Sequence, residues 1–395
     1  MGTTVLTPDK ERSNNMLFFM NIIGLFTISL SPVFSYFSQS ELYGVNSPLL
    51  IGIILVIASV FIGKAHFYEK ILPILVLITI VAYYILFSGD FFETSVTKDI
   101  ILSWLSWNLL AGIWRLRLSN SRAKVAKFFL LLALAVLCLT YFGFRVLFPE
   151  AGKTDFIGAN FIGLCAVLMI MVSLKHFNAR SIGAQLGGLL CLLISVSGAF
   201  ASSSRFALVV VAFFTLFVVL TKLTKLTPEG FVAALMAILG TLLFVLIAFL
   251  FVGDDFGIVF TFANQQWDHI VGRLGSLASA DVFEGTRVSQ IFDFLGLLET
   301  NPSFLFFPIP GADFIASEKG FSDNSLFELA GYTGFLPSIF IFLLLMRGLF
   351  QQMTVLDASV CLIGLLSFNV LLMVPFVALL HMFLLAFPVS RVRIN

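Results

Sequence analysis

Charge is scarce in this sequence. Only 11% of its 395 residues are Asp, Glu, Lys or Arg, and mean hydropathy reaches +1.04, whereas a soluble domain carries roughly 25% charged residues. This composition excludes an ordinary soluble globular protein. The net charge is +1 and the sequence has no basic cluster. A surface that binds the phosphate backbone of DNA or RNA is therefore excluded, and no nucleic-acid partner is expected.

Cysteine and histidine are also rare, with four of each. The cysteines fall in apolar runs without metal-ligand spacing, which predicts buried small hydrophobic residues and no disulfides. No metal and no cofactor are expected. A cleavable signal is not predicted either, because Lys10 and Arg12 precede an apolar run that lacks a small-residue cleavage site and is long enough to span a bilayer.

Long hydrophobic runs are abundant. A hydrocarbon core about 30 Å thick needs about 20 apolar residues per helix. The sequence therefore predicts an all-α integral membrane protein, a single polytopic domain over 1–395 with about 12 transmembrane helices. Pro375 favours a break that divides the final apolar block into two helices. The predicted spans are 16–37, 48–63, 71–88, 99–114, 126–148, 156–174, 183–201, 206–221, 230–252, 326–346, 356–371 and 374–388.

The basic residues indicate an orientation. With a cytoplasmic N-terminus, alternate loops place 16 of the 23 Lys and Arg residues inside, at every cytoplasmic loop. An eleven-span chain would place Arg391 and Arg393 outside, so twelve spans and two cytoplasmic termini are predicted. Seven basic residues face out: Lys98, Arg145, Lys153, Arg205, Arg273, Arg287 and Lys319.

The longest polar segment, 253–325, becomes a large loop on the outer side, between helices 9 and 10. It holds Arg273, Arg287, His269 and ten carboxylates. Apolar residues over 288–298 are spaced as in an amphipathic helix, which Asn301 and Pro302 end. The loop is therefore expected to be folded.

Spans 6, 8 and 10 all start on the outer side, where helix N-termini offer free N–H groups and partial positive charge to an anion. Asn160 opens span 6, Ser204 and Arg205 open span 8, and Ser325 with Glu328 forms a capping-box spacing at span 10. Each of these residues also has a purely structural interpretation. The serines and Glu328 could cap their helices, and Asn160 could form a hydrogen bond to a neighbouring helix. Arg205 at an apolar helix start usually indicates a partner.

Four short motifs on this face resemble the O-antigen polymerase and O-antigen ligase superfamily of bacterial envelope glycosyltransferases. Each motif is weakly specific alone, but their order and spacing over about 150–345 make the set more specific. The ligases need a histidine before the motif asparagine, and here that position is Asp323, which favours the polymerase branch (Wzy type). The motifs are Gly158-Ala159-Asn160-Phe161-Ile162, Ser203-Ser204-Arg205-Phe206-Ala207, Gly285-Thr286-Arg287, and Asp323-Asn324-Ser325-Leu326 with Gly331 and Gly334.

The resemblance implies polymerisation of undecaprenyl-diphosphate-linked oligosaccharide repeat units at the periplasmic face of the bacterial inner membrane, with a chain-length regulator (Wzz type) and a flippase as partners. The loop over 253–325 would then be periplasmic. A diphosphate leaving group needs cations and helix N-termini, and the acceptor hydroxyl needs a base. The predicted diphosphate-binding residues are Arg205, Arg287, Arg273, Ser204, Asn160 and Asn324. The candidate bases are Asp323, His269 and Glu284; ordering of the turn before span 10 is an equally good role for Asp323.

Two other functions stay open. One is an O-antigen ligase acting on lipid A–core. The other is a lipid-linked oligosaccharide flippase, a transporter class that often shows internal repeats and ionisable residues near the bilayer midplane. The sequence shows no repeat, and His381 is the one ionisable residue that stands out within a span.

Overall fold

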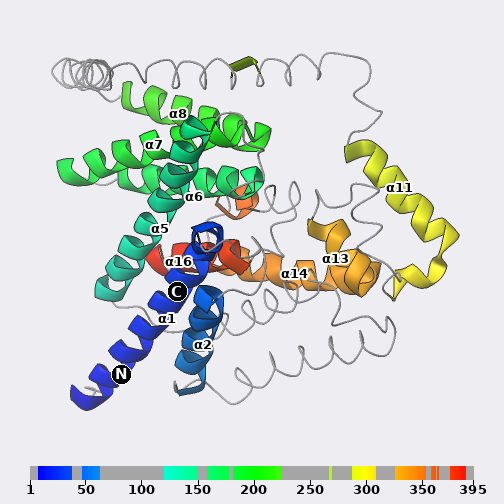
Figure 1. Cartoon of the computed structure of the whole chain (residues 1–395), viewed down its shortest axis with the longest axis horizontal. Helices are drawn as coiled ribbons and strands as arrows, with labels where there is room; N and C mark the ends of the chain where they lie inside the picture. Colours follow the sequence, from blue (N-terminus) through cyan, green and yellow to red (C-terminus); the bar gives the residue numbers. More distant parts are fainter. Residues whose placement is uncertain are drawn as a thin grey trace, which may run out of the picture. The chain divides into compact units, whose positions relative to one another are not determined.

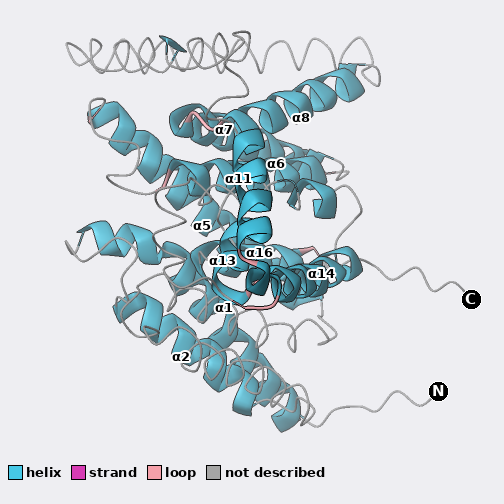
Figure 2. Cartoon of the chain, turned by 90° about the vertical axis from the view of Figure 1, so that its right-hand side faces the viewer, coloured by secondary structure: helices cyan, strands magenta, loops and turns pink. Residues whose placement is uncertain are grey.

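The computed structural model of the chain describes residues 8–37, 47–62, 120–148, 158–177, 181–223, 267–268, 287–307, 325–352, 357–361, 363 and 374–387. Within these ranges the chain is helical, with no strand (Figure 2). The predicted all-α class is confirmed for this part of the chain. The predicted spans 71–88, 99–114 and 230–252 lie outside the described residues, as does most of 356–371.

Most predicted spans that fall within the described ranges correspond to one helix each (Figure 1). Among the described helices, four are long and apolar enough to cross a membrane: those containing 15–34, 121–147, 159–176 and 182–202. The helices that each correspond to one predicted span are α1 (Pro8–Phe37), α2 (Ser47–Ile62), α5 (Asn120–Leu147), α6 (Ala159–Phe177), α7 (Ile182–Ser202), α8 (Arg205–Leu223) and α16 (Val374–Ala386).

The chain divides into two compact units. The first comprises residues 1–133 and 281–395, and the second comprises 134–280, so α5 contributes to both.

In the first unit α1 and α2 touch through their backbones at a pair of glycines. A Cβ on Gly24 would lie 2.8 Å from the Gly52 carbonyl oxygen, and a Cβ on Gly52 would lie 2.8 Å from that of Gly24. One buried polar contact accompanies them: the Asn21 amide donates to Ser59 Oγ at 3.1 Å. Small residues and hydrogen bonds of this kind hold helices together in lipid, where apolar burial gives no net drive.

In the second unit α6 is the central helix. Its residues 161–173 are all buried, which is typical of a helix surrounded by protein. Helix α7 packs along it through small residues: Ser195 Oγ donates to the Ala166 carbonyl at 2.7 Å. Gly198 leaves room for Cys138, whose Sγ would lie 2.9 Å from a Cβ there. Helix α8 packs against both α6 and α7.

The helix predicted within the 253–325 loop and the predicted span 326–346 can both be compared with the structure. Helix α11 (Arg287–Thr300) extends the predicted 288–298 helix by one to two residues at its ends. The predicted tenth span, 326–346, is helical but is divided once. The chain forms α13 (Ser325–Thr333) and α14 (Phe335–Gln352), separated by Gly334 at φ +91°. Few residues other than glycine adopt that backbone conformation.

Candidate functional site

Helix α6 begins three residues after 156, the predicted start of span 6. The Ile162 N–H donates to the Gly158 carbonyl at 3.2 Å, and the helix begins at Ala159. Asn160 lies in its first turn with a half-buried side chain. The amide is thus at the open end of a helix whose following residues are buried.

A two-residue turn joins α7 to α8. Ser203 adopts the left-handed conformation (φ 50°, ψ 23°), the one positive φ among the described residues other than glycine, and its N–H donates to the Phe200 carbonyl at 3.1 Å. The Ser204 N–H then donates to Ser202 Oγ at 3.3 Å, and the Ser204 carbonyl accepts the first α8 hydrogen bond, from Leu208, at 2.9 Å. Left-handed serine costs about 1–2 kcal/mol, so the packing around it must enforce this turn.

The starts of α6 and α8 meet at Gly163. A Cβ built there would lie 2.8 Å from Ser204 Cβ, 3.0 Å from Ser204 Oγ and 3.2 Å from Ala207 Cβ. Asn160 precedes Gly163 by three residues and therefore shares its helix face. The structure thus brings together two of the four motifs, although about 40 residues separate them in sequence.

The Ser204 hydroxyl faces this contact and not solvent. Ser204 is 4% exposed, and its Oγ has no hydrogen-bond partner among the described residues. A buried hydroxyl without a partner costs about 1–3 kcal/mol, so its presence calls for a reason. Its predicted role in diphosphate binding stays a prediction, and its contact with Gly163 gives it a second role in the packing of α8 on α6.

The other two motifs belong to helices that also pack together, within the first unit. Phe294 of α11 stacks on Phe327 of α13 with ring centroids 4.5 Å apart. It also contacts Phe304 at 5.4 Å and Phe335 at 5.3 Å. With Ala330, Leu297 and Leu298 these rings form one apolar cluster, so α11 is held against the start of the α13–α14 segment.

Several predicted site residues are located only in part. Arg205 and Arg287 are the first residues of α8 and α11, the positions that favour bound anions. The structure describes the backbone of these two residues but not their side chains. The Glu328 side chain is likewise not described. Arg273, His269, Glu284, Asp323 and Asn324 lie outside the described residues.

One arginine was missed as a candidate. Arg145, in the last turn of α5, is only 5% exposed and belongs to the second unit with α6 and α8. A guanidinium keeps its charge when buried, so it needs polar partners or an anion nearby. Its predicted outward position was the available signal, but burial depends on packing and could not be foreseen.

None of the four cysteines forms a disulfide, and all four are buried. In the part of the chain that the structure describes, no three His, Cys, Asp or Glu residues lie close enough together to hold a metal ion. No known protein family, curated protein or solved structure matches the chain.

Proposed function

We propose that the chain is a membrane glycosyltransferase that polymerises undecaprenyl-diphosphate-linked repeat units at the periplasmic face of the bacterial inner membrane. The growing glycan would leave its lipid diphosphate and join the non-reducing end of an incoming lipid-linked unit. The bond from the sugar anomeric carbon to the phosphate oxygen breaks, and a bond to the acceptor hydroxyl oxygen forms. The hydroxyl proton passes to a base, and undecaprenyl diphosphate departs.

The observation that carries this proposal is the packing of the α6 and α8 starts at Gly163. It brings the first turns of α6, which contain Asn160, next to the start of α8, whose first residue is Arg205. Two helix starts and an arginine form a region of positive potential without a metal ion. Such a region suits the charge that develops on a departing diphosphate.

The residue roles follow from this chemistry. Arg205 and Arg287 bind the donor diphosphate, with Arg273 as a third cation. Asn160, Ser204 and Asn324 supply neutral hydrogen bonds. Asp323 is the first candidate for the base, although the α13 N-terminus next to it favours its ionised form and lowers its basicity. His269 and Glu284 are the alternatives.

The flippase alternative has less support. The prominent intramembrane candidate for proton coupling, His381 in α16, has its Nδ1 2.8 Å from the Val377 carbonyl oxygen in the same helix. That geometry places a proton on Nδ1 and fits a histidine that stabilises its own helix. The ligase alternative keeps the same leaving group and differs only in the acceptor.

The deciding experiment is the glycan profile of a strain that lacks this chain. A polymerase deletion leaves single repeat units on the lipid A–core, whereas a ligase deletion leaves bare core. A flippase deletion leaves lipid-linked units on the cytoplasmic leaflet. Either of the last two profiles would contradict the proposal.

Complementation of that strain then tests the arginines. Arg205→Ala or Arg287→Ala should abolish long chains at normal expression, because each removes a charge-assisted hydrogen bond of about 1.5–3 kcal/mol. Arg205→Lys should restore them only in part, since lysine lacks the bidentate fork. Arg180→Ala, predicted to be cytoplasmic, is the matched control.

The same assay tests the general base. Asp323→Asn keeps the shape of the side chain but removes its ability to accept the proton, so we expect it to abolish long chains. Long chains at a normal rate would transfer the role of the base to His269 or Glu284.

A further inference from the structure

We propose that the corner formed by Phe306 and Phe307, at the end of the α11 segment, is inserted into the outer lipid interface beside α14. The loop between helices 9 and 10 would then rest in the bilayer surface at this point and not stand free in the periplasm. The occupant of the apolar surface is the acyl region of bilayer lipid. This inference is independent of the reaction that the chain catalyses.

The first step is the attachment of this corner to the α13–α14 break. A short 3₁₀ helix, η4 (Pro302–Leu305), follows α11, and the N–H groups of Phe306 and Phe307 both donate to the Ser303 carbonyl, at 3.1 and 3.0 Å. A Cβ on Gly334 would lie 2.6 Å from the Phe306 carbonyl carbon and 2.8 Å from the Phe307 nitrogen. The corner therefore touches the backbone of the residue where α14 begins.

The second step is the surface that α14 presents. Leu336, Phe340 and Leu343 are all exposed, and Phe340 is 64% exposed. Their spacing of four and then three residues places them on one face of the helix, while Ser338 and Phe342 are buried. Such an exposed apolar stripe is what a lipid-facing helix shows.

The exposed stripe of α14 begins directly after the break. Leu336 lies two residues after Gly334, and the apolar part of the helix ends before Arg347, which is predicted to be cytoplasmic. Gly334 is therefore at the end of the stripe that is farther from the cytoplasmic side. A segment in contact with Gly334 lies beside the outer end of this apolar surface.

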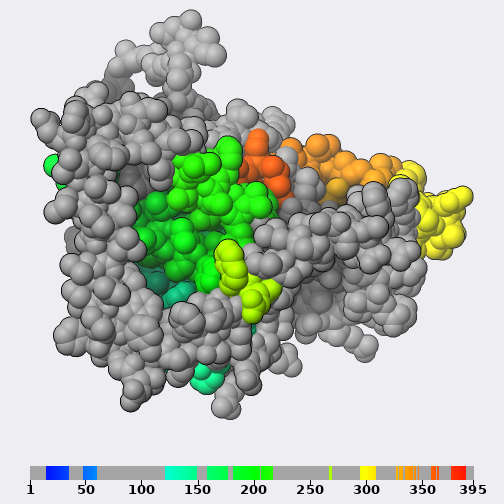
Figure 3. Space-filling model, turned by 90° about the horizontal axis from the view of Figure 1, so that it is seen from above, coloured from blue at the N-terminus to red at the C-terminus, as the bar shows by residue number. Residues whose placement is uncertain are grey.

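The third step is the segregation of exposed residues along the segment itself. The turn between α11 and η4 exposes the polar residues 299–301 and 303, together with Pro302. The corner that follows exposes two aromatic rings, Phe306 at 54% and Phe307 at 40%. Figure 3 shows the yellow atoms of α11 beside the orange atoms of α13 and α14. A polar turn followed by an apolar corner is the pattern of an interfacial anchor.

Site-directed spin labelling of the full chain tests this arrangement. Single cysteines replace Phe306, Phe307, Phe340, Thr300 or Asn301, and the proteins are reconstituted in phosphatidylethanolamine–phosphatidylglycerol vesicles. The four native cysteines are buried, so the unsubstituted protein serves as the labelling blank. Collisions of each nitroxide with oxygen, which concentrates in lipid, are compared with collisions with a water-soluble nickel chelate.

We expect labels at Phe306, Phe307 and Phe340 to collide mainly with oxygen, and labels at Thr300 and Asn301 mainly with the chelate. A Phe306 label with the chelate preference of Thr300 would place the corner in water and overturn the proposal. Collisions with neither reagent would mean that protein, such as a second copy of the chain, covers the corner, which overturns it as well. A chelate-accessible Phe340 would remove the lipid-facing stripe on which the inference depends.

Discussion

Gly163 is the residue at which the proposed site depends most directly on packing. Its missing side chain lets the α8 start approach α6, with Ser204 Cβ 2.8 Å and Ala207 Cβ 3.2 Å from where a Cβ would be. A Cβ atom is fixed by the backbone, so side-chain rotation cannot move these two Cβ atoms away. Any added methyl group must therefore push the two helix starts apart.

We expect Gly163→Ala to lower the free energy of unfolding by about 1–3 kcal/mol, the usual range for overpacking a core. It should also shorten the glycan chains, since Asn160 and Arg205 would separate. Gly143→Ala in α5 is the matched control: a Cβ there meets nothing within 4 Å, and alanine favours the helix by about 0.5–1 kcal/mol. The apparent melting temperature in detergent and the glycan profile check both variants. A Gly163→Ala protein as stable as wild type would show that α6 and α8 adjust freely.

At this scale the sequence predicts the helix starts but not their contact. Asn160 and Arg205 could be placed at helix N-termini because capping serines and the onset of apolar runs are local signals. The Gly163 contact and the burial of Arg145 depend on residues about 40 or more positions away in sequence or on whole-helix packing. Neither leaves a local pattern.

Among the elements, α13 and α14 show most clearly what hydropathy omits. The apolar run over 326–346 predicts one helix, since hydropathy reports composition and not backbone dihedrals. Gly334 breaks it, because φ +91° and the backbone of Phe306 leave no room for a side chain. The amphipathic pattern of 288–298, in contrast, predicted α11 well, because its apolar face packs on this segment through Phe294.

We expect Gly334→Ala to release α11 from the start of α14. A non-glycine residue in a left-handed conformation costs about 1–2 kcal/mol, and the new Cβ would overlap the Phe306 carbonyl carbon at 2.6 Å. Hydrogen exchange over 294–307 should accelerate, while exchange in α6 and α7 should not. Gly296→Ala, on α11 itself with nothing within 4 Å, should leave exchange unchanged or slower. Equal protection in both variants would show that Gly334 does not hold the loop segment.

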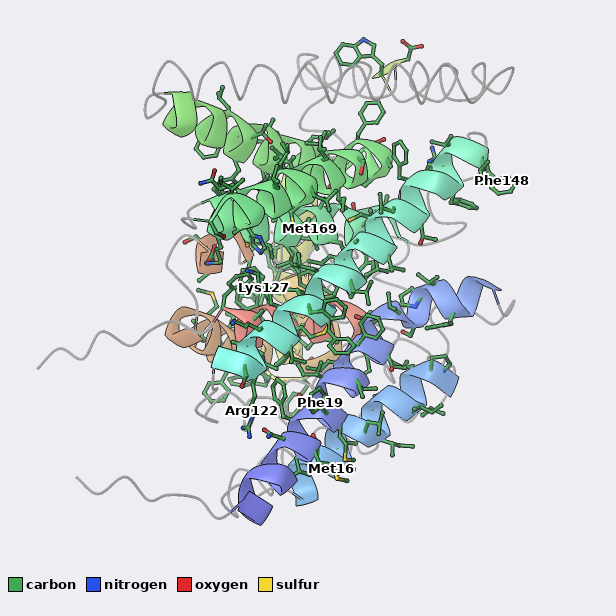
Figure 4. All side chains as sticks on the ribbon, turned by 90° about the vertical axis from the view of Figure 1, so that its left-hand side faces the viewer. Met16, Phe19, Arg122, Lys127, Phe148 and Met169 are labelled. Atoms are coloured by element: carbon green, nitrogen blue, oxygen red, sulfur yellow. The ribbon has the colours of Figure 1, made fainter. Side chains whose placement is uncertain are left out.

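For the whole molecule, the contacts at one end of the first unit bear on topology. The Arg122 guanidinium near the start of α5 donates to Asn15 Oδ1 of α1 through Nε and Nη2, at 3.1 and 2.8 Å. Lys127 Nζ lies 5.3 Å from the centre of the Phe387 ring, just after α16. Figure 4 shows Arg122 and Lys127 near one end of α5 and Phe148 at the other.

These contacts agree with the predicted number of membrane crossings. If the predicted spans cross the membrane, residues in contact near helix ends should lie on one side of it, as Asn15 and Arg122 would, and as Lys127 and Phe387 would. The predicted spans place four crossings between the first pair and eight between 122 and 387, both even numbers. An eleven-span chain would place Phe387 on the opposite side from Lys127, so we expect twelve spans. The assignment of this end to the cytoplasmic side rests on the distribution of basic residues alone.

We therefore expect reporter fusions after residue 395 and before residue 8 to remain cytoplasmic: a C-terminal alkaline phosphatase should be inactive and a C-terminal green fluorescent protein should fluoresce. A phosphatase inserted at Gly311, within the loop between helices 9 and 10, should be active and is the positive control. If both termini are exported, the even number of crossings stands but the orientation is wrong. If only the C-terminus is exported, the number of crossings is odd. The contact between Lys127 and Phe387 would then be wrong, and the break that we predict at 369–375 would be the first place to look for the error.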